Sequence, residues 1–407
     1  MSGGGRKRVL SGMRPTGRLH IGHFFGALKN WIKMQEEFDC YYFVADWHAL
    51  TSDYADSSQI AQNSLEIATD WLAAGLDPHK STFFVQSQVP EHAELHLLLS
   101  MVTPLSWLER VPTYKEQLDN IKDKNLHTYG FLGYPVLQSA DIVMYDADLV
   151  PVGEDQVSHV ELTREIVRRF NYFNGGKLQP GLSPAQQWKA AEIVLPNLPQ
   201  GYFEGGVKGD FSHLLAEARS EHGLEHYLGL LRGRPEYFTS PDILREPEAM
   251  LTETPRIPGT DGRKMSKSYG NAISFTEEDE AIRAKTKVMM TDPARKRRTD
   301  PGNPDVCPVY DWHKLFSPPE TLQWAATGCR SAGIGCIECK AAMAENLIKW
   351  IAPVRQRRKG YEAEPERVRA ILAEGSARAR ATAQKTMTRV RDAVFGAAQT
   401  EPAGTGR

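Results

Sequence analysis

The alternation of short apolar runs with longer amphipathic segments is the feature that most constrains the fold of this chain. Within the first 100 residues, KRVLSG, CYYFVAD and STFFVQS each have the length of a strand. The segments between them carry apolar residues at helical spacing, for example Phe24, Leu28 and Ile32 in the first. Strand and helix in alternation predict an α/β domain with a doubly wound parallel sheet of the Rossmann type. Ligands of such domains bind beyond the carboxyl ends of the strands, so the loop after KRVLSG is the first candidate site.

The rest of the chain predicts further units, because 407 residues are more than one ordinary core holds. The pattern continues with a helix around YPVLQSADIVMYD and a strand LVPV. Gly and Pro then recur at short intervals, which indicates an insertion, either surface decoration or a unit with a role of its own. Helical patterns dominate the last third, followed by a tail of disordered composition. The predicted divisions are a Rossmann catalytic domain over 1–173, an insertion over 174–243, the rest of the catalytic domain over 244–275, an all-α domain over 276–396 and a disordered tail over 397–407.

Composition is that of a globular protein, with 41% hydrophobic and 25% charged residues. No apolar run approaches the roughly 18 residues of a membrane span, and the first ten residues lack the apolar core of a signal peptide. We therefore expect a cytoplasmic protein without a membrane segment. The formal charge of −2 hides basic runs at 295–298, 355–359 and 367–391, which are either solvated faces or contacts for a polyanion.

The stretch RPTGRLHIGHFFG, residues 14–26, joins a Gly/Pro-containing loop to a helix at the ligand edge of the predicted sheet. Free backbone N–H groups and the positive end of the helix dipole suit a phosphate there. His20 and His23 share one helix face, and Gly22 lets a nucleotide approach the backbone closely. Either histidine taken alone is as compatible with a structural role as with a catalytic one.

A second loop carries two ammonium groups, Lys264 and Lys267, within KMSKS. It follows GTDG, whose composition predicts a backbone mobile enough to close over an anion. Two loop lysines by themselves are typical of a solvated surface. HIGH near the start of an α/β unit and KMSKS far downstream form a combination with few accidental matches.

Four of the five cysteines fall within one short stretch, separated by 21, 6 and 2 residues. Clustered thiols in a reducing compartment indicate a metal or cluster site, and the spacing does not choose between zinc and iron–sulfur. Cys40 is interpreted as a core residue. The sequence HAELH lacks the glutamate placement of a zinc-protease motif, so His92 and His96 are interpreted as core or surface residues. The predicted ligands are Cys307, Cys329, Cys336 and Cys339.

The chain resembles the class I aminoacyl-tRNA synthetases, and within them the tryptophanyl enzymes. The resemblance lies in SGMRPTGRLHIGH, YYFVADWHALT, FVQSQVPEH, YPVLQSADIVMYDADLVPVGEDQ and GRKMSKS, and it does not visibly extend through 174–243. It implies that the amino-acid carboxylate attacks the α-phosphate of ATP and that the acyl group then passes to tRNA(Trp). It also implies Mg²⁺ bridging the phosphates, an anticodon-binding role for the all-α domain over 276–396 and a homodimer. In the subset with this cysteine pattern it implies a [4Fe-4S] cluster, with Zn²⁺ as the alternative. The basic runs would then contact tRNA phosphates.

The resemblance assigns the catalytic roles to His20, His23, Lys264 and Lys267. His20 and His23 would donate toward phosphate and ribose, while the two lysines would hold the pyrophosphate as charge develops on it. This chain has Arg14 where many relatives carry glutamine. The implied ATP contacts are Met13, Arg14, Pro15, Gly22, His23, Lys115, Gly153, Glu154, Asp155, Ile257, Lys264, Met265, Ser266, Lys267 and Ser268.

An indole offers one N–H donor and a large apolar face, so its pocket needs one buried acceptor among apolar walls. Asp141, Gln138 and Tyr134 are spaced to share one face of the predicted helix. The resemblance makes Asp141 the indole acceptor. The implied tryptophan-binding set is Asp141, Tyr134, Gln138, Gln156, Val150, Val152 and His48.

Two other functions fit parts of the sequence. Tyrosyl enzymes share the Y-x-x-x-Q-x-x-D pattern, although LVPVGEDQ and WHALT favour tryptophan. A non-catalytic paralogue that binds RNA or tryptophan would have no use for the KMSKS lysines. We therefore predict a tryptophan-tRNA ligase.

Overall fold

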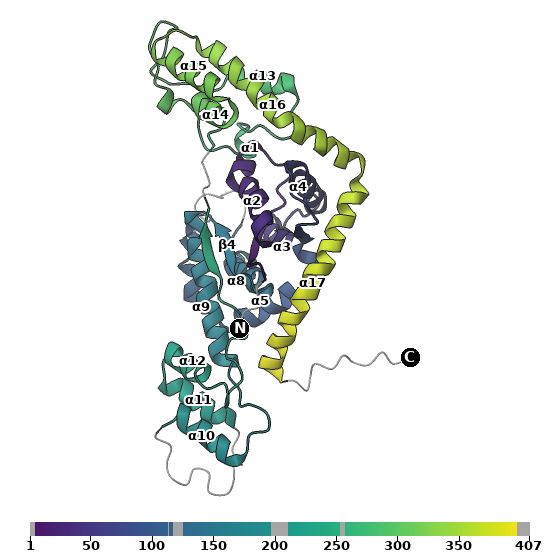
Figure 1. Cartoon of the computed structure of the whole chain (residues 1–407), viewed down its shortest axis with the longest axis vertical. Coiled ribbons are helices and arrows are strands. Elements are labelled where there is room, and N and C mark those ends of the chain that lie inside the picture. The colour runs from purple at the N-terminus through teal and green to yellow at the C-terminus, as the bar shows by residue number, and fades with distance from the viewer. Residues whose placement is uncertain (1–4, 113, 117–124, 197–210, 253–256, 397–407) are drawn as a thin grey trace.

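The computed structural model describes residues 5–112, 114–116, 125–196, 211–252 and 257–396. The sheet and its covering helices form the centre of the molecule, between the C-terminal helices α13–α16 at one end and the helices of the insertion at the other (Figure 1). The predicted disorder of 397–407 lies outside the described residues. Among the described helices, none is both long and apolar enough to cross a membrane.

The sheet has five parallel strands in the order β3-β2-β1-β4-β5, which confirms the predicted fold class. The chain builds outward from β1 on one side and then returns to its other side, so the strand order reverses between β1 and β4. Parallel strands open their carboxyl ends to ligands at such a switch point. The strands are β1 (Arg8–Met13), β2 (Asp39–Val44), β3 (Ser81–Val85), β4 (Leu149–Val152) and β5 (Glu248–Leu251).

Helices cover both faces of the sheet and continue as an all-helical C-terminal region. A π-helical turn, η1, interrupts the helix that follows β1, so α1, η1 and α2 form one segment. In the first half, the helices are α1 (Ile21–His23), η1 (Phe24–Leu28), α2 (Lys29–Glu37), α3 (Asp46–Asp53), α4 (Ile60–Ala74), η2 (Gln86–Gln88), α5 (Glu91–Val102), α6 (Leu105–Glu109), α8 (Tyr129–Met144), η3 (Glu154–Gln156) and α9 (Val157–Asn174). In the second half, they are α10 (Pro184–Val194), α11 (Phe211–Glu221), α12 (Leu224–Arg232), η4 (Lys267–Tyr269), α13 (Asp279–Lys287), η5 (Pro304–Val306), α14 (Pro308–Phe316), α15 (Pro319–Arg330), α16 (Cys336–Ala363) and α17 (Pro365–Phe395).

The two faces of the sheet are packed into separate cores, as the two-residue period of a strand requires. In β2, Cys40 and Tyr42 join the core that contains Trp31 and Trp71. Tyr41 and Phe43 of the same strand join the other core. Burial on both faces explains why these strands appear in the sequence as continuous apolar runs rather than as alternating ones.

The last helix, α17, lies along the outer edge of strand β3 (Figure 1). Its Gly375 approaches so closely that a Cβ there would lie 1.8 Å from the carbonyl oxygen of Phe83. Ser376 Oγ accepts a hydrogen bond from the Val85 N–H at 3.2 Å. The apolar stripe of α17 belongs to the same cores as the sheet. The helix therefore covers an edge strand that would otherwise present unpaired backbone groups.

Many arginines of the basic runs form ion pairs within the molecule, while the contact of these runs with tRNA stays a prediction. On α17, Arg380 pairs with Glu91 at 2.9 Å and Arg389 pairs with Asp146 at 2.6 Å. On α16, Arg355 pairs with Asp279 at 2.5 Å. Arginines held in this way by acids of the sheet domain and of α13 fix helices in place.

The described part of the segment 174–243 contains three helices, α10 to α12, around a core of their own. Its two ends meet in an antiparallel bridge between Leu178 and Phe238. The Thr239 N–H also donates to the carbonyl of Lys177 at 2.7 Å. The inserted helices thus leave and rejoin the sheet domain through a narrow neck.

Candidate active site

The HIGH segment, residues 20–23, starts the helical run directly beyond the carboxyl end of β1. The His20 N–H donates to Nδ1 of His23 at 3.2 Å, and the two rings lie 3.7 Å apart. Because Nδ1 of His23 accepts this bond, the neutral ring carries its proton on Nε2 and can donate there. Nδ1 of His20 is buried and has no hydrogen-bond partner in the described part of the chain. Gly22 is tightly surrounded, since a Cβ would lie 2.9 Å from the His20 ring.

The KMSKS loop, residues 264–268, is held by one buried amide side chain. Asn271 is 2% exposed; its Oδ1 accepts from the Ser266 N–H at 2.7 Å, and its Nδ2 donates to the carbonyl of Lys264 at 3.2 Å. Nδ2 of Asn271 also donates to Asp261 at 2.7 Å. Asn271 was not predicted as a site residue, because its sequence neighbourhood carries no signal beyond a turn-like composition.

The HIGH segment and the KMSKS loop lie against each other. Nζ of Lys267 donates to the carbonyl of Thr16 at 2.8 Å. The segment that follows the loop pairs with the HIGH segment, through a bridge between Ser274 and His20 and a hydrogen bond from the Ile21 N–H to the carbonyl of Ile273 at 3.0 Å. Two motifs about 240 residues apart in the sequence are thus neighbours at one edge of the sheet.

Burial and mutual proximity set the protonation of this edge. Burial and the neighbouring His23 and Lys267 lower the pKa of His20 to about 3. Burial and Lys267 lower the pKa of His23 to about 4. Burial also lowers the pKa of Lys267. Both imidazoles are therefore neutral hydrogen-bond donors near pH 7, which suits contacts to phosphate and ribose oxygens.

A cavity of about 370 Å³ opens beyond the carboxyl ends of β1 and β4. Its walls include Phe43, Phe131 and Arg14, whose Nη2 lies 3.5 Å from Asp53 of α3. The Phe43 ring packs against the backbone of Gly12, which has no side chain. A Cβ on Gly12 would lie 2.4 Å from that ring. All residues of the implied tryptophan-binding set line this cavity: Asp141, Tyr134, Gln138, Gln156, Val150, Val152 and His48.

Asp141 is the buried acceptor of the cavity, with a side chain that is 1% exposed. It bonds with His48 at 2.8 Å, with His92 at 2.6 Å and with the amide of Gln86 at 2.7 Å. Burial acts to raise its pKa, but the hydrogen bonds from His48 and His92 outweigh burial and lower it to about 2. Asp141 is therefore an ionised acceptor at neutral pH.

Three supporting side chains were not predicted as site residues. His92 is fully buried and links Asp141 to the hydroxyl of Tyr145 at 2.7 Å, which confirms it as a core histidine. Gln86 holds both carboxylate oxygens of Asp141. His159 lines the cavity and bonds with Gln138 at 2.7 Å. FVQSQVPEH contains two of these residues, but only the fold brings them to Asp141.

The remaining predicted ATP residues do not all line the cavity: some line it, some are buried elsewhere and some are exposed. Gly153 and Arg14 line the cavity, and Ile257 and Met265 are buried side by side, with the Met265 N–H donating to the carbonyl of Ile257 at 3.3 Å. Met13 and Pro15 flank Arg14 at the end of β1, and Asp155 lies in η3. Five predicted ATP residues are exposed and lie outside the walls of the cavity, as far as the chain is described: Lys115, Glu154, Lys264, Lys267 and Ser268.

The four clustered cysteines gather between α14, α15 and the start of α16. Burial, together with Cys307, Cys329 and Cys336, raises the pKa of Cys339 to about 12, so the four thiols lie within electrostatic reach of one another. Gly302 leaves space for Cys329, because a Cβ there would lie 2.6 Å from its Sγ. In the described ranges, no set of three or more His, Cys, Asp or Glu side chains is arranged to hold a metal ion.

Comparisons with known proteins agree with this geometry. The family model described as tRNA synthetases class I (W and Y) matches residues 2–190 and 230–352. A tryptophan–tRNA ligase of Ralstonia nicotianae is 50% identical over 398 residues, covering 95% of this chain and 98% of the relative. A tryptophan–tRNA ligase of Thermotoga maritima is 44% identical over 389 residues, with 95% and 98% covered. Because these alignments cover 95% of the chain, they include most of the inserted segment.

Among solved structures, the tryptophanyl-tRNA synthetase of Campylobacter jejuni, complexed with ADP and tryptophan, has a TM-score of 0.71 and 29% identity. The match covers 95% of this chain and 98% of that one. Fold, motifs and family model together define a class I aminoacyl-tRNA synthetase of the group that serves tryptophan and tyrosine. Within that class, the chain belongs to the tryptophan–tRNA ligase family.

Proposed function

We propose that this chain activates L-tryptophan with ATP to tryptophanyl-adenylate and transfers the acyl group to tRNA(Trp) in the cytoplasm. The observation that carries the proposal is the meeting of the HIGH segment and the KMSKS loop beside a cavity with a buried, ionised acceptor. Such a reaction needs no covalent enzyme nucleophile, because positioning and charge stabilisation on the polyphosphate suffice.

On the ATP side, the neutral His23 donates from Nε2, and His20 offers the unpaired Nδ1 of a buried ring. Lys267 holds charge that builds on the leaving pyrophosphate, from a position that already reaches the loop before the HIGH segment. Lys264 is also exposed on this loop and reaches the phosphates when the loop closes over them. Mg²⁺ bound together with ATP would supply further charge neutralisation on the polyphosphate.

On the tryptophan side, Asp141 accepts the indole N–H, and the apolar walls of β4 and the aromatic rings cover the ring faces. Tyr134, Gln138 and Gln156 lie along the rest of the cavity, where they hold the amino and carboxylate groups. Phenylalanine would leave Asp141 without that donor. A buried acceptor that loses a hydrogen-bond partner costs about 1–3 kcal/mol of binding free energy.

ATP–pyrophosphate exchange with purified protein tests the proposal. We expect exchange with tryptophan and at most a trace with tyrosine or phenylalanine. Exchange with tyrosine alone would reassign the specificity. Absence of exchange with all three amino acids would indicate the non-catalytic alternative.

The role of Lys267 is tested by Lys267→Ala. We expect tryptophan-dependent exchange to fall at least about 100-fold, the usual effect of losing one transition-state contact, while tryptophan binding is retained. Lys385→Ala on α17 is the matched control, because that lysine is exposed on a helix away from the site. Wild-type exchange in Lys267→Ala would remove this lysine from the mechanism.

The cysteine set is proposed to bind a [4Fe-4S] cluster, with Zn²⁺ as the alternative that the test distinguishes. Support comes from four thiols within electrostatic reach, from the space that Gly302 leaves and from the buried Arg295, whose Nη1 lies 3.8 Å from Cys329 Sγ. Bound iron and sulfide of anaerobically purified protein, with its visible absorption, are the measurement. A colourless protein that contains zinc would overturn the cluster.

The chain is also proposed to form a homodimer through an apolar surface on α5, α6 and the start of α8. Leu97, Met101, Leu105 and Tyr129 are 53–72% exposed there. Exposed apolar patches on soluble proteins often mark the surfaces through which they bind other proteins. Light scattering should give a dimer for the wild type and a monomer for Leu97→Lys/Met101→Lys; a monomeric wild type would contradict the proposal.

A further inference from the structure

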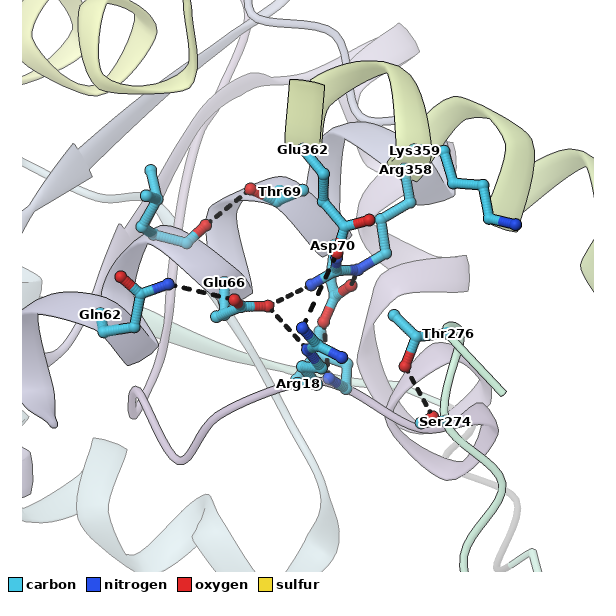
Figure 2. Close-up of polar contacts among 12 residues, drawn as sticks. Arg18, Gln62, Glu66, Thr69, Asp70, Ser274, Thr276, Arg358, Lys359 and Glu362 are labelled. Atoms are coloured by element: carbon cyan, nitrogen blue, oxygen red, sulfur yellow. Dashed lines mark hydrogen bonds and ion pairs between the residues drawn. The ribbon is translucent and has the colours of Figure 1, made fainter. Parts of the chain in front are cut away.

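Asp70, in the middle of α4, is a fully buried carboxylate directly behind the HIGH segment. One of its oxygens, Oδ2, accepts a hydrogen bond from the Leu19 N–H at 2.6 Å. The other oxygen, Oδ1, accepts from Nε of Arg358 at 2.5 Å. Figure 2 shows the Asp70 side chain beside Arg358 of α16. A single side chain thus joins the backbone next to His20 to the long helix α16.

Arg358 is 1% exposed and uses its whole guanidinium in this contact. Besides Asp70, it bonds with Glu66 on α4 and with Glu362 one turn further along α16. Glu66 also accepts from Arg18 at 3.0 Å (Figure 2). The network therefore holds two consecutive residues of the loop before the HIGH segment: Arg18 by its side chain and Leu19 by its backbone.

The backbone of Leu19 is fixed on both sides. Its N–H is held by Asp70, and its carbonyl accepts from the Phe275 N–H at 3.3 Å. Phe275 follows the strand-like pairing of Ser274 with His20. The start of the HIGH segment thus lies between the α4–α16 network and the segment that follows the KMSKS loop. A shift of Asp70 would move the backbone of Leu19 and, with it, the ring of His20.

Burying a carboxylate and a guanidinium costs solvation that a well-packed apolar pair would not cost. The neighbouring residue Arg357 already joins α16 to α4, because its Nε donates to the carbonyl of Ala73 at 2.7 Å. A buried ion pair is not needed for that purpose. The charged Asp70 therefore has a further role: its Oδ2 holds the backbone N–H of Leu19.

We propose that Asp70 and Arg358 are positioning residues for adenylate formation: the guanidinium on α16 fixes the Asp70 carboxylate, and that carboxylate fixes the Leu19 backbone so that His20 faces the nucleotide. The inference rests on the proposed function. According to this proposal, the position of α16 determines the position of the HIGH segment, although none of the described residues of α16 lines the cavity.

The experiment compares Asp70→Asn, Arg358→Met and the double variant with the control Arg357→Met. Arg357 lies on the same helix and contacts the same neighbouring helix, but it does not touch Asp70. For each protein, kcat and the KM for tryptophan in pyrophosphate exchange are measured well below the thermal midpoint. Hydrogen exchange of the Leu19 amide is the structural readout. The double variant buries no unpaired charge, so its folding does not depend on the pair.

We expect kcat to fall about 10- to 100-fold in each single variant, because displacement of a catalytic group by about 1 Å has effects of this size. The double variant should lose no more than the worse single one, since the two residues act as one unit. The KM for tryptophan should stay within about 2-fold in all of them, because the Asp141 cavity lies apart from this network. Leu19 exchange should quicken in these variants and stay slow in Arg357→Met.

A wild-type kcat in the double variant, or equal losses in Arg357→Met, would overturn the inference and leave the pair a purely structural one. These outcomes differ from failure of the proposed function, which would show as wild-type protein without tryptophan-dependent exchange. Arg358→Lys is an intermediate variant. It keeps the positive charge but loses the planar guanidinium that bonds with both Asp70 and Glu66. It should recover only part of kcat.

Discussion

At the scale of single residues, the site depends on polar groups that are buried and yet satisfied. Asp141 has its carboxylate surrounded by His48, His92 and Gln86. These donors orient the acceptor and keep it ionised, which an isolated carboxylate in an apolar cavity would not be. The same network gives the cavity a fixed acceptor direction, and a fixed direction is what discrimination between an indole and a phenyl ring requires.

Asp141→Asn should therefore impair recognition of tryptophan more than chemistry. An amide in place of the carboxylate weakens the hydrogen bond to the indole by about 1.5–3 kcal/mol, or roughly 10- to 100-fold in KM for tryptophan. Pyrophosphate exchange at varied tryptophan concentration measures this. An unchanged KM would show that Asp141 does not contact the substrate.

His20 and His23 predict a pH dependence of stability. Their pKa values in the folded protein, about 3 and about 4, lie below the ordinary value near 6.5. The unfolded chain therefore binds protons between pH 6.5 and these values while the folded chain does not, so stability falls as the pH is lowered through that window. At pH 5 the loss from His20 alone is about 2 kcal/mol.

Urea unfolding of the wild type and of His20→Gln at pH 7 and pH 5 measures the effect. The variant should lose less stability than the wild type between these pH values, because glutamine does not titrate. Equal losses would mean that His20 is as exposed to protonation in the folded protein as in the unfolded chain.

At the scale of elements, the contact of α17 with β3 depends on one glycine. The helix can lie on the strand only because Gly375 has no side chain. Helix formation by itself would favour alanine there by roughly 0.5–1 kcal/mol. The close approach and the bond from Val85 to Ser376 outweigh that preference.

Gly375→Ala should destabilise the protein by about 1–3 kcal/mol, the usual cost of overpacking, and lower its thermal midpoint. Gly360→Ala in α16 is the control, because a Cβ there meets no atom within 4 Å. The control should be neutral or slightly stabilising by helix propensity. If both variants had the same midpoint, α17 would not lie on β3 as described.

At the scale of the whole molecule, the catalytic centre is assembled from distant parts of the chain, whereas the inserted helices leave and rejoin the sheet domain at one neck and contact it through α9. The helices α16 and α17 return from the far end of the molecule to the sheet (Figure 1). Asp70 with Arg358 and Glu91 with Arg380 tie these helices to the sheet domain. The inserted helices have their own core and lie at the opposite end.

Replacing residues 179–237 by a short turn should therefore leave tryptophan-dependent pyrophosphate exchange within about 3-fold of the wild type, because the bridge between Leu178 and Phe238 already brings the two ends together. Aminoacylation of tRNA measured beside exchange shows whether the insertion contacts tRNA. A loss of exchange itself would mean that the insertion supports the catalytic domain.

The sequence by itself determined the strands β1 to β4, the helix that carries Tyr134, Gln138 and Asp141, and the two nucleotide motifs. These are local patterns, in which spacing fixes the periodicity and the shared face of the side chains. Strand β5 escaped prediction because EAML is a short edge strand without a continuous apolar run. Local patterns therefore predicted the residues that line the site, but not the side chains that hold them, such as Gln86 and His92.

Only the tertiary structure decided which residues meet across the chain. His92 and Gln86 reach Asp141, and Arg358 reaches Asp70, over separations of 49 to 288 residues that no local pattern encodes. The basic runs show the same limit, because their composition does not reveal that many of these arginines form ion pairs with acids of the same chain. A charge pattern specifies what a side chain can bind, and the surrounding fold specifies which partner is within reach.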